Sequence, residues 1–289
     1  MTDHRFLRVA AVSMKHTESA VGANLERHLK WLERAASAEA RIVCFPEFAL
    51  TGWVHQRKEA LTLTSAPIQQ LKAWASRHDT FIATGFIEKR AGNLFNTAIL
   101  IGPQGQYGTM RKVNLVRQEA AYYRPGRDFP VFDLGYCSVG IAICADATRF
   151  ETLHILSLRG AEVILAPHAN TLHPYGHNAQ GWLDWRLERW PLFARDACVY
   201  IVGVNNAGSF ECGDGEDQEA RWCGGGAIID YKGQVVASPP PGVANRECMM
   251  LADLDIQAVR EAREGSELLS EFRPCIVYNR RSGWKHGKC

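Results

Sequence analysis

The sequence lacks the features that mark several large classes of protein. It has no run of about 20 apolar residues, the length of a membrane-spanning helix, and its start, MTDHRFLRVA, has no apolar signal core after basic residues. It also lacks a cluster of Lys and Arg, and its net charge is only +2, which argues against a polyanionic partner. We therefore expect a cytoplasmic protein that has neither a membrane nor a nucleic acid as its partner.

Regular cysteine and histidine patterns are missing as well. The nine Cys residues are scattered and form no CxxC pair, so neither a zinc ribbon nor a thioredoxin-type motif is indicated. His168, His173 and His177 lie close together in the sequence, but they span a Pro–Tyr–Gly turn and match no regular ligand spacing. We therefore predict that the protein has no metal site.

Linkers, low-complexity tracts and internal repeats are absent too. The composition is 46% hydrophobic and 22% charged, as in an ordinary soluble globular protein, and 289 residues can bury a large core. We expect a single domain over residues 1–289, with a core that spans about 6–278.

Short apolar runs alternate with amphipathic segments along the chain. This alternation, with hairpins interspersed, predicts an α/β fold of mixed sheets with helices outside. Asn24 is a candidate N-cap, and Pro191 is expected to kink its helix. The expected strands cover 6–14, 41–47, 80–90, 94–102, 139–146, 162–170, 199–208 and 247–255, with a hairpin at 223–238, and the expected helices cover 24–40, 68–79, 149–161, 181–198 and about 256–270.

Three reactive side chains stand where apolar runs end. Glu47 closes RIVCFPE, Lys112 follows the Gly-bearing turn GQYGTMRK, and Cys144 closes SVGIAIC. In α/β enzymes a rigid sheet positions reacting groups at such strand ends. A carboxylate, an ammonium and a thiol together supply a base, a cation and a nucleophile, which suffice for acyl transfer.

Each of these residues also has an ordinary structural explanation. A free Cys is commonly a packed core residue, a carboxylate often caps a loop or pairs with Arg, and most Lys side chains are solvated. Glu119, seven residues after Lys112, could hold that ammonium or orient a water, or could be a surface helix residue. Taken singly, none of the four identifies a catalytic site.

The segments around these residues form an ordered series. FPEFALTGW surrounds Glu47, RKVNLVRQEAAYYRPG surrounds Lys112, and GIAICADATRFE surrounds Cys144; APHAN, GVNNAG, the hairpin at 224–237 and EFRPCIVY then follow. Together these segments resemble the nitrilase-like carbon–nitrogen hydrolase superfamily, and the resemblance covers almost the whole chain.

The resemblance implies a fold and a chemistry. The fold would be a four-layer α-β-β-α sandwich of two mixed sheets, with no metal and no organic cofactor. Cys144 would attack a small linear amide or carbamoyl compound, release ammonia and form a thioester that water hydrolyses. Glu47 would act as the base, Lys112 and the backbone N–H of Ala145 would hold the oxyanion, and Glu119 would be an additional active-site carboxylate.

The resemblance also implies self-association. Family members commonly pair through helices beside the nucleophile, so we expect a homodimer or a higher homo-oligomer. The aromatic segment with Trp182, Trp185 and Trp190 is a candidate for that surface, with plain core packing as the alternative.

The segment after the nucleophile departs from the family pattern. Many relatives read Cys-x-Asp-x-Arg-Phe-Pro-Glu, whereas CADATRFE has one extra residue before Arg149 and no Pro. Nitrilases usually show Cys-Trp-Glu where this chain has Cys144, Ala145 and Asp146, which favours amide, including ureido, substrates over nitriles. A nitrilase, and a catalytically silent binding or assembly member, remain as alternatives. The candidate substrate contacts are Phe48, Tyr123, His168 and Asn170.

Overall fold

Two six-stranded sheets form the centre of the molecule in a computed structural model, which describes residues 6–172, 179–211, 219–240, 245–266 and 269. In the first sheet the strands run in the order β15 (Cys248–Asp255), β1 (Phe6–Ser13), β2 (Ile42–Cys44), β3 (Phe81–Arg90), β4 (Asn93–Gly102) and β5 (Gly105–Arg111). In the second the order is β14 (Val235–Ala237), β13 (Gly226–Ile229), β10 (Tyr200–Asn205), β8 (Val163–His168), β7 (Ser138–Ile141) and β6 (Val131–Asp133).

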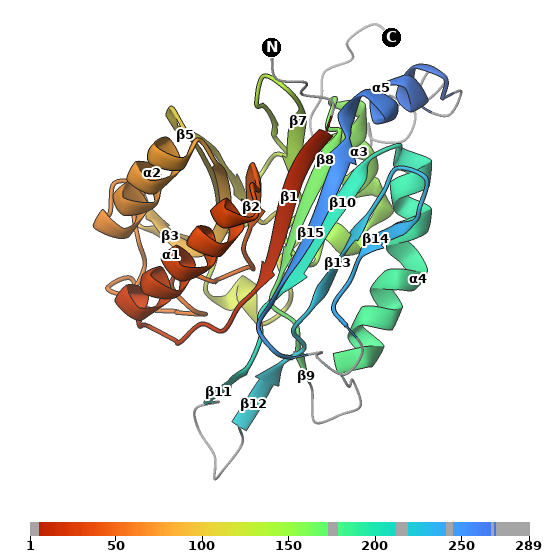
Figure 1. The fold of residues 1–289 in the computed structure, drawn as a ribbon. Coiled ribbons are helices and arrows are strands. Elements are labelled where there is room, and N and C mark those ends of the chain that lie inside the picture. The colour runs from red at the N-terminus through yellow and green to blue at the C-terminus, as the bar shows by residue number, and fades with distance from the viewer. Residues whose placement is uncertain (1–5, 173–178, 212–218, 241–244, 267–268, 270–289) are drawn as a thin grey trace, which may run out of the picture.

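Both sheets are mixed, as the sequence predicts. In the first, β1, β2 and β3 are parallel to one another, while β15, β4 and β5 pair antiparallel. In the second, β7, β8 and β10 are parallel, and the outer strands pair antiparallel. A small third sheet of β11 (Ser209–Glu211), β12 (Glu219–Trp222) and β9 (Thr171–Leu172) lies at one end of the molecule (Figure 1).

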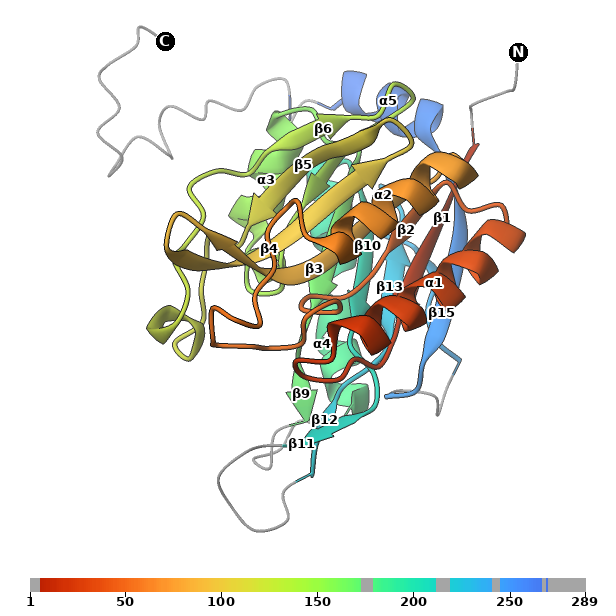
Figure 2. The same ribbon diagram turned by 90° about the vertical axis from the view of Figure 1, so that its left-hand side faces the viewer.

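Helices cover the outer face of each sheet and complete four layers. α1 (Val21–Ser37) and α2 (Ala66–His78) lie on the first sheet, and α3 (Phe150–Leu158) and α4 (Ala179–Ala197) lie on the second (Figures 1 and 2). α5 (Ile256–Glu264) follows β15, and Asp255 caps it through Oδ1, which accepts from the Ala258 N–H at 3.0 Å. The four-layer α-β-β-α sandwich is therefore confirmed.

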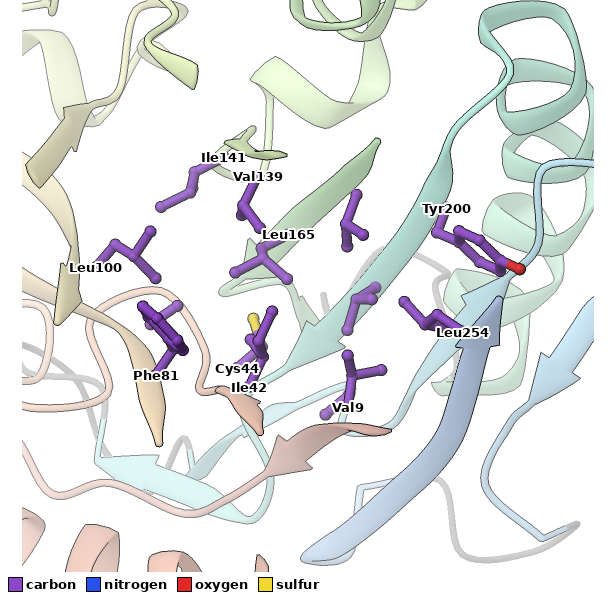
Figure 3. Close-up of a cluster of buried hydrophobic side chains, with 14 of the residues drawn as sticks. Val9, Ile42, Cys44, Phe81, Leu100, Val139, Ile141, Leu165, Tyr200 and Leu254 are labelled. Atoms are coloured by element: carbon purple, nitrogen blue, oxygen red, sulfur yellow. The ribbon is translucent and has the colours of Figure 1, made fainter. Parts of the chain in front are cut away.

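The period of two along each strand builds this layering. Val9 and Ala11 of β1 point between the sheets, where they join residues of β7, β8 and β10, whereas Ala10 and Val12 belong to the core beneath α1 and α2. Figure 3 shows side chains from both sheets meeting in the central layer. Both faces of these strands are buried, so the strands read as continuous apolar runs.

Several local predictions need correction. Asn24 lies inside α1, which begins at Val21, and its Nδ2 donates to the backbone oxygens of Thr17 and Leu50. The segment before Lys112 is strand β5, not a Gly-bearing turn. Pro191 lies inside α4, which continues on both sides of it, and the expected kink stays a prediction. The strand before Cys144 ends at Ile141, and Cys144 takes a positive φ of 48°.

The aromatic segment of α4 faces inward. Trp190 is fully buried and Trp182 is 7% exposed, and both pack with the apolar face of the second sheet. Core packing therefore explains these two residues, and homo-oligomer formation stays a prediction. The expected core limit at residue 278, the segment EFRPCIVY, His173 and His177 lie outside the described residues. No helix in the described part of the chain has the length and apolar character needed to cross a membrane.

Candidate active site

Two carboxylates share one ammonium in the interior of the protein. Lys112 Nζ lies 2.8 Å from Glu47 Oε1 and 2.8 Å from Glu119 Oε2, and all three side chains are at most 2% exposed. Asn96 of β4 joins the cluster, because its Nδ2 lies 2.7 Å from both Glu47 Oε1 and Glu119 Oε1. Glu119 is thus buried and not a surface helix residue.

The two carboxylates differ in whether an oxygen is left without a hydrogen bond. Both oxygens of Glu119 are occupied, since Oε1 accepts from Lys112 and Asn96 and Oε2 accepts from the Val116 N–H at 2.9 Å. In Glu47 both donors go to Oε1, and Oε2 accepts no hydrogen bond within the described residues. Glu47 therefore keeps a free oxygen that can take a proton.

The backbone of Glu47 is held from two sides. A Cβ on Gly85 of β3 would lie 2.7 Å from Glu47 Cα and 2.5 Å from the Phe48 nitrogen, so only glycine permits this close approach. Asn206, just after β10, donates from Nδ2 to the Glu47 carbonyl at 2.7 Å. Phe48, with φ of 61°, turns the chain away immediately after the carboxylate.

Cys144 sits on a sharp turn between β7 and α3. Its N–H donates to the Pro167 carbonyl at 2.9 Å, and its positive φ turns the chain into a 3₁₀ segment at Asp146–Thr148. Left-handed backbone at a non-glycine residue is strained and tends to occur at functional sites. The N–H of Ala145 donates to no acceptor among the described residues, so it is available to an oxygen beside the sulfur.

The segment after Cys144 forms a short turn. A 3₁₀ segment covers Asp146–Thr148, and α3 begins at Phe150. Arg149 is exposed and donates from Nη1 to the Ala145 carbonyl at 2.7 Å. Asp146 is fully buried and accepts from the loop that follows Lys112, so the departure from the family pattern leaves the nucleophile turn tied to the lysine.

Asn170 lies close to the sulfur of Cys144. Its Oδ1 is 3.8 Å from Cys144 Sγ, 2.9 Å from Trp182 Nε1 and 3.4 Å from Arg186 Nη2. Asn205 fixes the Asn170 backbone through two hydrogen bonds, of 2.8 and 3.0 Å. Two residues at the end of β10 therefore position two parts of the site: Asn205 holds Asn170, and Asn206 holds Glu47.

Burial and charge set the protonation of these groups. Burial, together with the carboxylate of Glu47, raises the pKa of Cys144 to about 12 against the opposing effect of Lys112. Burial also raises the pKa of Glu47, with Lys112 opposing and Glu119 adding to the rise. Burial alone would lower the pKa of Lys112, but Glu47, Cys144 and Glu119 outweigh it and raise that pKa. The resting site thus combines a protonated thiol, a charged ammonium and a carboxyl whose proton affinity is enhanced.

Aromatic side chains stand next to Glu47. Phe48 and Tyr123 are each 3% exposed and pack with Val54, Ile87 and Leu94. The Tyr123 hydroxyl donates to the Val54 carbonyl at 2.8 Å. His168, also expected to contact substrate, is fully buried. Its Nδ1 lies 2.8 Å from the Ala166 carbonyl, and its ring centre lies 5.7 Å from that of Trp182 and 5.4 Å from that of Trp190.

Sequence reasoning missed four contributors, namely Asn96, Arg186, Asn205 and Asn206. Two carried a readable signal. Asn96 is a polar residue inside the apolar run LFNTAILIG. Arg186 is four residues from both Trp182 and Trp190, a spacing that places it on the same helical face as two buried aromatic residues.

Comparisons with known proteins identify the family of the chain. The family model described as carbon-nitrogen hydrolase matches residues 8–264. The chain belongs to this family. It is a carbon–nitrogen hydrolase of the nitrilase superfamily, as the sequence motifs indicate.

Relatives within the superfamily carry different activities in their names. The chain is 28% identical to a nitrilase of Pyrococcus abyssi, with 89% of this chain and 93% of that protein covered. It is 26% identical to an (R)-stereoselective amidase of Pseudomonas, with 92% of each covered, and 27% identical to an omega-amidase of Mus musculus, with 92% and 95% covered.

Solved structures show the same fold. A carbon–nitrogen hydrolase from Helicobacter pylori aligns with a TM-score of 0.80 at 18% identity, covering 96% of this chain and 98% of that one. An amidase from Nesterenkonia aligns with a TM-score of 0.77 at 18% identity, covering 94% and 99%.

Proposed function

We propose that this carbon–nitrogen hydrolase cleaves the C–N bond of a small linear amide or carbamoyl compound to an acid and ammonia, through a thioester on Cys144. The observation that carries the proposal is the buried ion cluster in which Lys112 Nζ lies 2.8 Å from Glu47 Oε1 while Glu47 Oε2 is left without a donor among the described residues. The amidase and omega-amidase relatives support the choice of an amide.

In the first half of the reaction, Cys144 Sγ attacks the amide carbon and its proton passes to Glu47. The raised pKa of Glu47 suits this transfer, because it brings the proton affinity of the carboxylate closer to that of the buried thiol. The C–S bond forms, the carbonyl oxygen becomes an oxyanion, and Glu47 returns the proton to the departing nitrogen. Ammonia leaves with the electron pair of the C–N bond, and a thioester remains.

The oxyanion would be held by Lys112 and Ala145. An ammonium has three N–H donors, and Glu47 and Glu119 take two of those of Lys112. The third, together with the free N–H of Ala145, is available to the developing negative charge. In the second half, Glu47 takes a proton from water and the water oxygen attacks the thioester carbon. The C–S bond then breaks, Glu47 returns the proton to the Cys144 sulfur, and the acid is released.

Glu119 would act as a positioning residue. Both of its oxygens are engaged with Lys112, Asn96 and the Val116 N–H, so it holds the ammonium and does not move a proton. Phe48, Tyr123 and Asn170 would line the space in which the acyl group lies. A homo-oligomeric, cytoplasmic protein remains the expectation from sequence, to be tested by light scattering and fractionation.

The test uses ammonia release from short amides, ureido acids and matched nitriles. We expect Cys144→Ala to abolish release from the preferred amide while its melting temperature stays near that of the parent. Cys137→Ala, at the other end of the same strand region, removes a thiol that is buried to a similar degree and should retain turnover. Turnover by Cys144→Ala would contradict the proposal, and faster hydrolysis of nitriles than of their amides would favour a nitrilase.

A further inference from the structure

His16 is fully buried in the loop between β1 and α1, although most loop residues lie at the surface. Each of its two ring nitrogens faces one oxygen: Nδ1 lies 3.0 Å from Asn206 Oδ1, and Nε2 lies 3.0 Å from Glu18 Oε1. The ring of Trp222 packs beside it, with 5.1 Å between the ring centres. The imidazole therefore contacts an amide, a carboxylate and an indole in the interior of the protein.

Asn206 connects this histidine to Glu47. The Asn206 side chain is fully buried, and its Nδ2 lies 2.7 Å from the Glu47 carbonyl oxygen and 3.4 Å from the His168 carbonyl oxygen. Both partners are acceptors, so the amide nitrogen must face them and the amide oxygen must face His16. With the amide reversed, its oxygen would meet the Glu47 carbonyl, and the hydrogen bond that holds this backbone would be lost.

The two oxygens beside His16 determine where its protons lie. Asn206 Oδ1 can only accept, so Nδ1 carries a proton. Glu18 is the one carboxylate within ion-pair distance of His16 in the described part of the chain, and an ionised carboxylate also only accepts, so Nε2 carries a proton as well. A neutral ring would leave one of these oxygens facing a lone pair. The contacts therefore favour an imidazolium paired with Glu18.

Glu18 is itself in contact with the segment that follows Glu47. A Cβ on Gly52, which has a φ of 74°, would lie 2.4 Å from Glu18 Oε2 and 2.7 Å from Glu18 Cα, so the two segments pack directly against each other. The series of contacts from Glu18 through His16 to Asn206 thus begins at the segment after Glu47 and ends at the Glu47 carbonyl.

We propose that His16 is a positioning residue for Glu47, which acts by holding the Asn206 amide in the one orientation that donates to the Glu47 backbone. This inference rests on the proposed amide hydrolysis, in which Glu47 takes the proton of Cys144. Reacting groups must be held within about 0.5 Å of their productive geometry, and a displacement of about 1 Å costs about 100-fold in rate. The loop after β1 thus contributes to the reaction although it supplies none of the reacting groups.

Two substitutions of His16 separate this role from plain packing. In His16→Asn the side-chain Nδ2 takes the place of the ring Nδ1 and can still donate to Asn206. In His16→Gln the amide reaches the place of the ring Nε2 and meets Glu18 instead. Both variants remove the ring and its packing beside Trp222. We expect kcat to stay within about threefold of the parent in His16→Asn and to fall about 10- to 100-fold in His16→Gln, with KM nearly unchanged in both.

Equal losses of kcat in the two variants would overturn the inference, because packing alone would then explain His16. A loss confined to KM would overturn it as well, and both results would leave amide hydrolysis standing. His78→Asn is the matched control and should keep kcat: on α2 the ring of His78 stacks on Trp74 at 4.1 Å, and its Nε2 lies 3.9 Å from Glu33. No turnover of any amide by the parent would contradict the proposed function itself.

A second measurement needs neither a substrate nor a folded variant. Nitrogen and proton NMR of the parent protein near neutral pH can follow the His16 ring, assigned through its bonds to the His16 backbone. We expect slowly exchanging protons on both ring nitrogens, because both face acceptors in the interior. An Nδ1 without a proton would overturn the inference, since His16 would then have no donor with which to hold the Asn206 amide.

Discussion

Asp146 binds Asn114 twice, and this contact joins the nucleophile turn to the loop after the lysine. Asp146 Oδ1 accepts from the Asn114 backbone N–H at 2.8 Å and from its Nδ2 at 2.7 Å, and Oδ2 accepts from the Val113 N–H at 3.3 Å. Asp146 follows Cys144 by two residues, and Asn114 follows Lys112 by two. The pair thus sets the relative position of a sulfur and an ammonium that are far apart in the sequence.

Asp146→Ala should therefore separate the two reacting groups. It leaves the N–H groups of Asn114 and Val113 without their acceptor, which costs about 1–3 kcal/mol of unfolding free energy. A displacement of about 1 Å between reacting groups costs about 100-fold in rate, so we expect kcat to fall by that order. Chemical denaturation and ammonia release measure the two effects.

Asp133→Ala serves as the control for this substitution. Asp133 is exposed, and the one donor to its Oδ1 in the described part of the chain is the Gly135 N–H, at 2.8 Å, in a surface turn. Unchanged kcat in Asp146→Ala would show that the nucleophile turn does not need this link.

Gly85→Ala should displace the Glu47 carboxylate. The added Cβ would lie within 2.7 Å of the Pro46 oxygen and Glu47 Cα, and both are backbone atoms that cannot move independently of the strand end. We expect a lower melting temperature and a fall in kcat larger than that in KM. Gly22→Ala, where nothing lies within 4 Å of the new Cβ, should leave kcat unchanged and should not lower the melting temperature, because alanine is favoured over glycine in a helix. Parent-like kcat in Gly85→Ala would mean that the close approach does not position Glu47.

Asn96→Ala should loosen the charge cluster without removing any charge. Asn96 Nδ2 is the neutral donor shared by Glu47 and Glu119, at 2.7 Å from each. Without this donor, Lys112 alone offsets the repulsion between the two carboxylates. We therefore expect kcat to fall about 10- to 100-fold. Asn93→Ala on the same strand, whose Nδ2 donates to the Ala91 carbonyl near the surface, should retain kcat. A parallel fall in both variants would point to damage to β4 instead.

The apparent pKa of the acid limb of the pH–rate profile should lie above the ordinary pKa of a glutamate. The base must lose its proton before the reaction, and burial holds the pKa of Glu47 above its usual 4.5. As pH falls, kcat/KM should therefore begin to decline at a higher pH than an exposed glutamate would give, with apparent values that belong to the coupled cluster. Circular dichroism at each pH verifies that the fold persists. An acid limb at or below 4.5 would contradict the role of Glu47.

The sequence predicted the layers of the fold better than it predicted the contacts around Lys112. Apolar runs and helical periodicity depend on neighbours in the chain, so β3, β4 and α2 fall within a few residues of the expected ranges. The cluster around Lys112 depends on strand order instead, because Asn96 meets Glu47 across 49 residues of sequence. No local pattern shows that Asn96 faces the carboxylates.

Two errors came from chemistry that local patterns leave ambiguous. The strand before Cys144 is shorter than expected, and Cys144 adopts a positive φ, which a sequence signals clearly only when the residue is glycine. Asn24, a typical cap residue, instead lies within α1, and its side chain binds the Thr17 backbone. In both cases tertiary contacts outweigh the local preference of the residue.

The most direct test of the account is the mass of the covalent intermediate. The protein is mixed with its preferred amide, quenched in acid during turnover and digested. We predict that the peptide containing Cys144 gains the mass of the acyl group, and that the adduct does not form in Cys144→Ala. Ammonia release at the parent rate with no adduct on Cys144, or an adduct on another residue that turns over at that rate, would contradict the account.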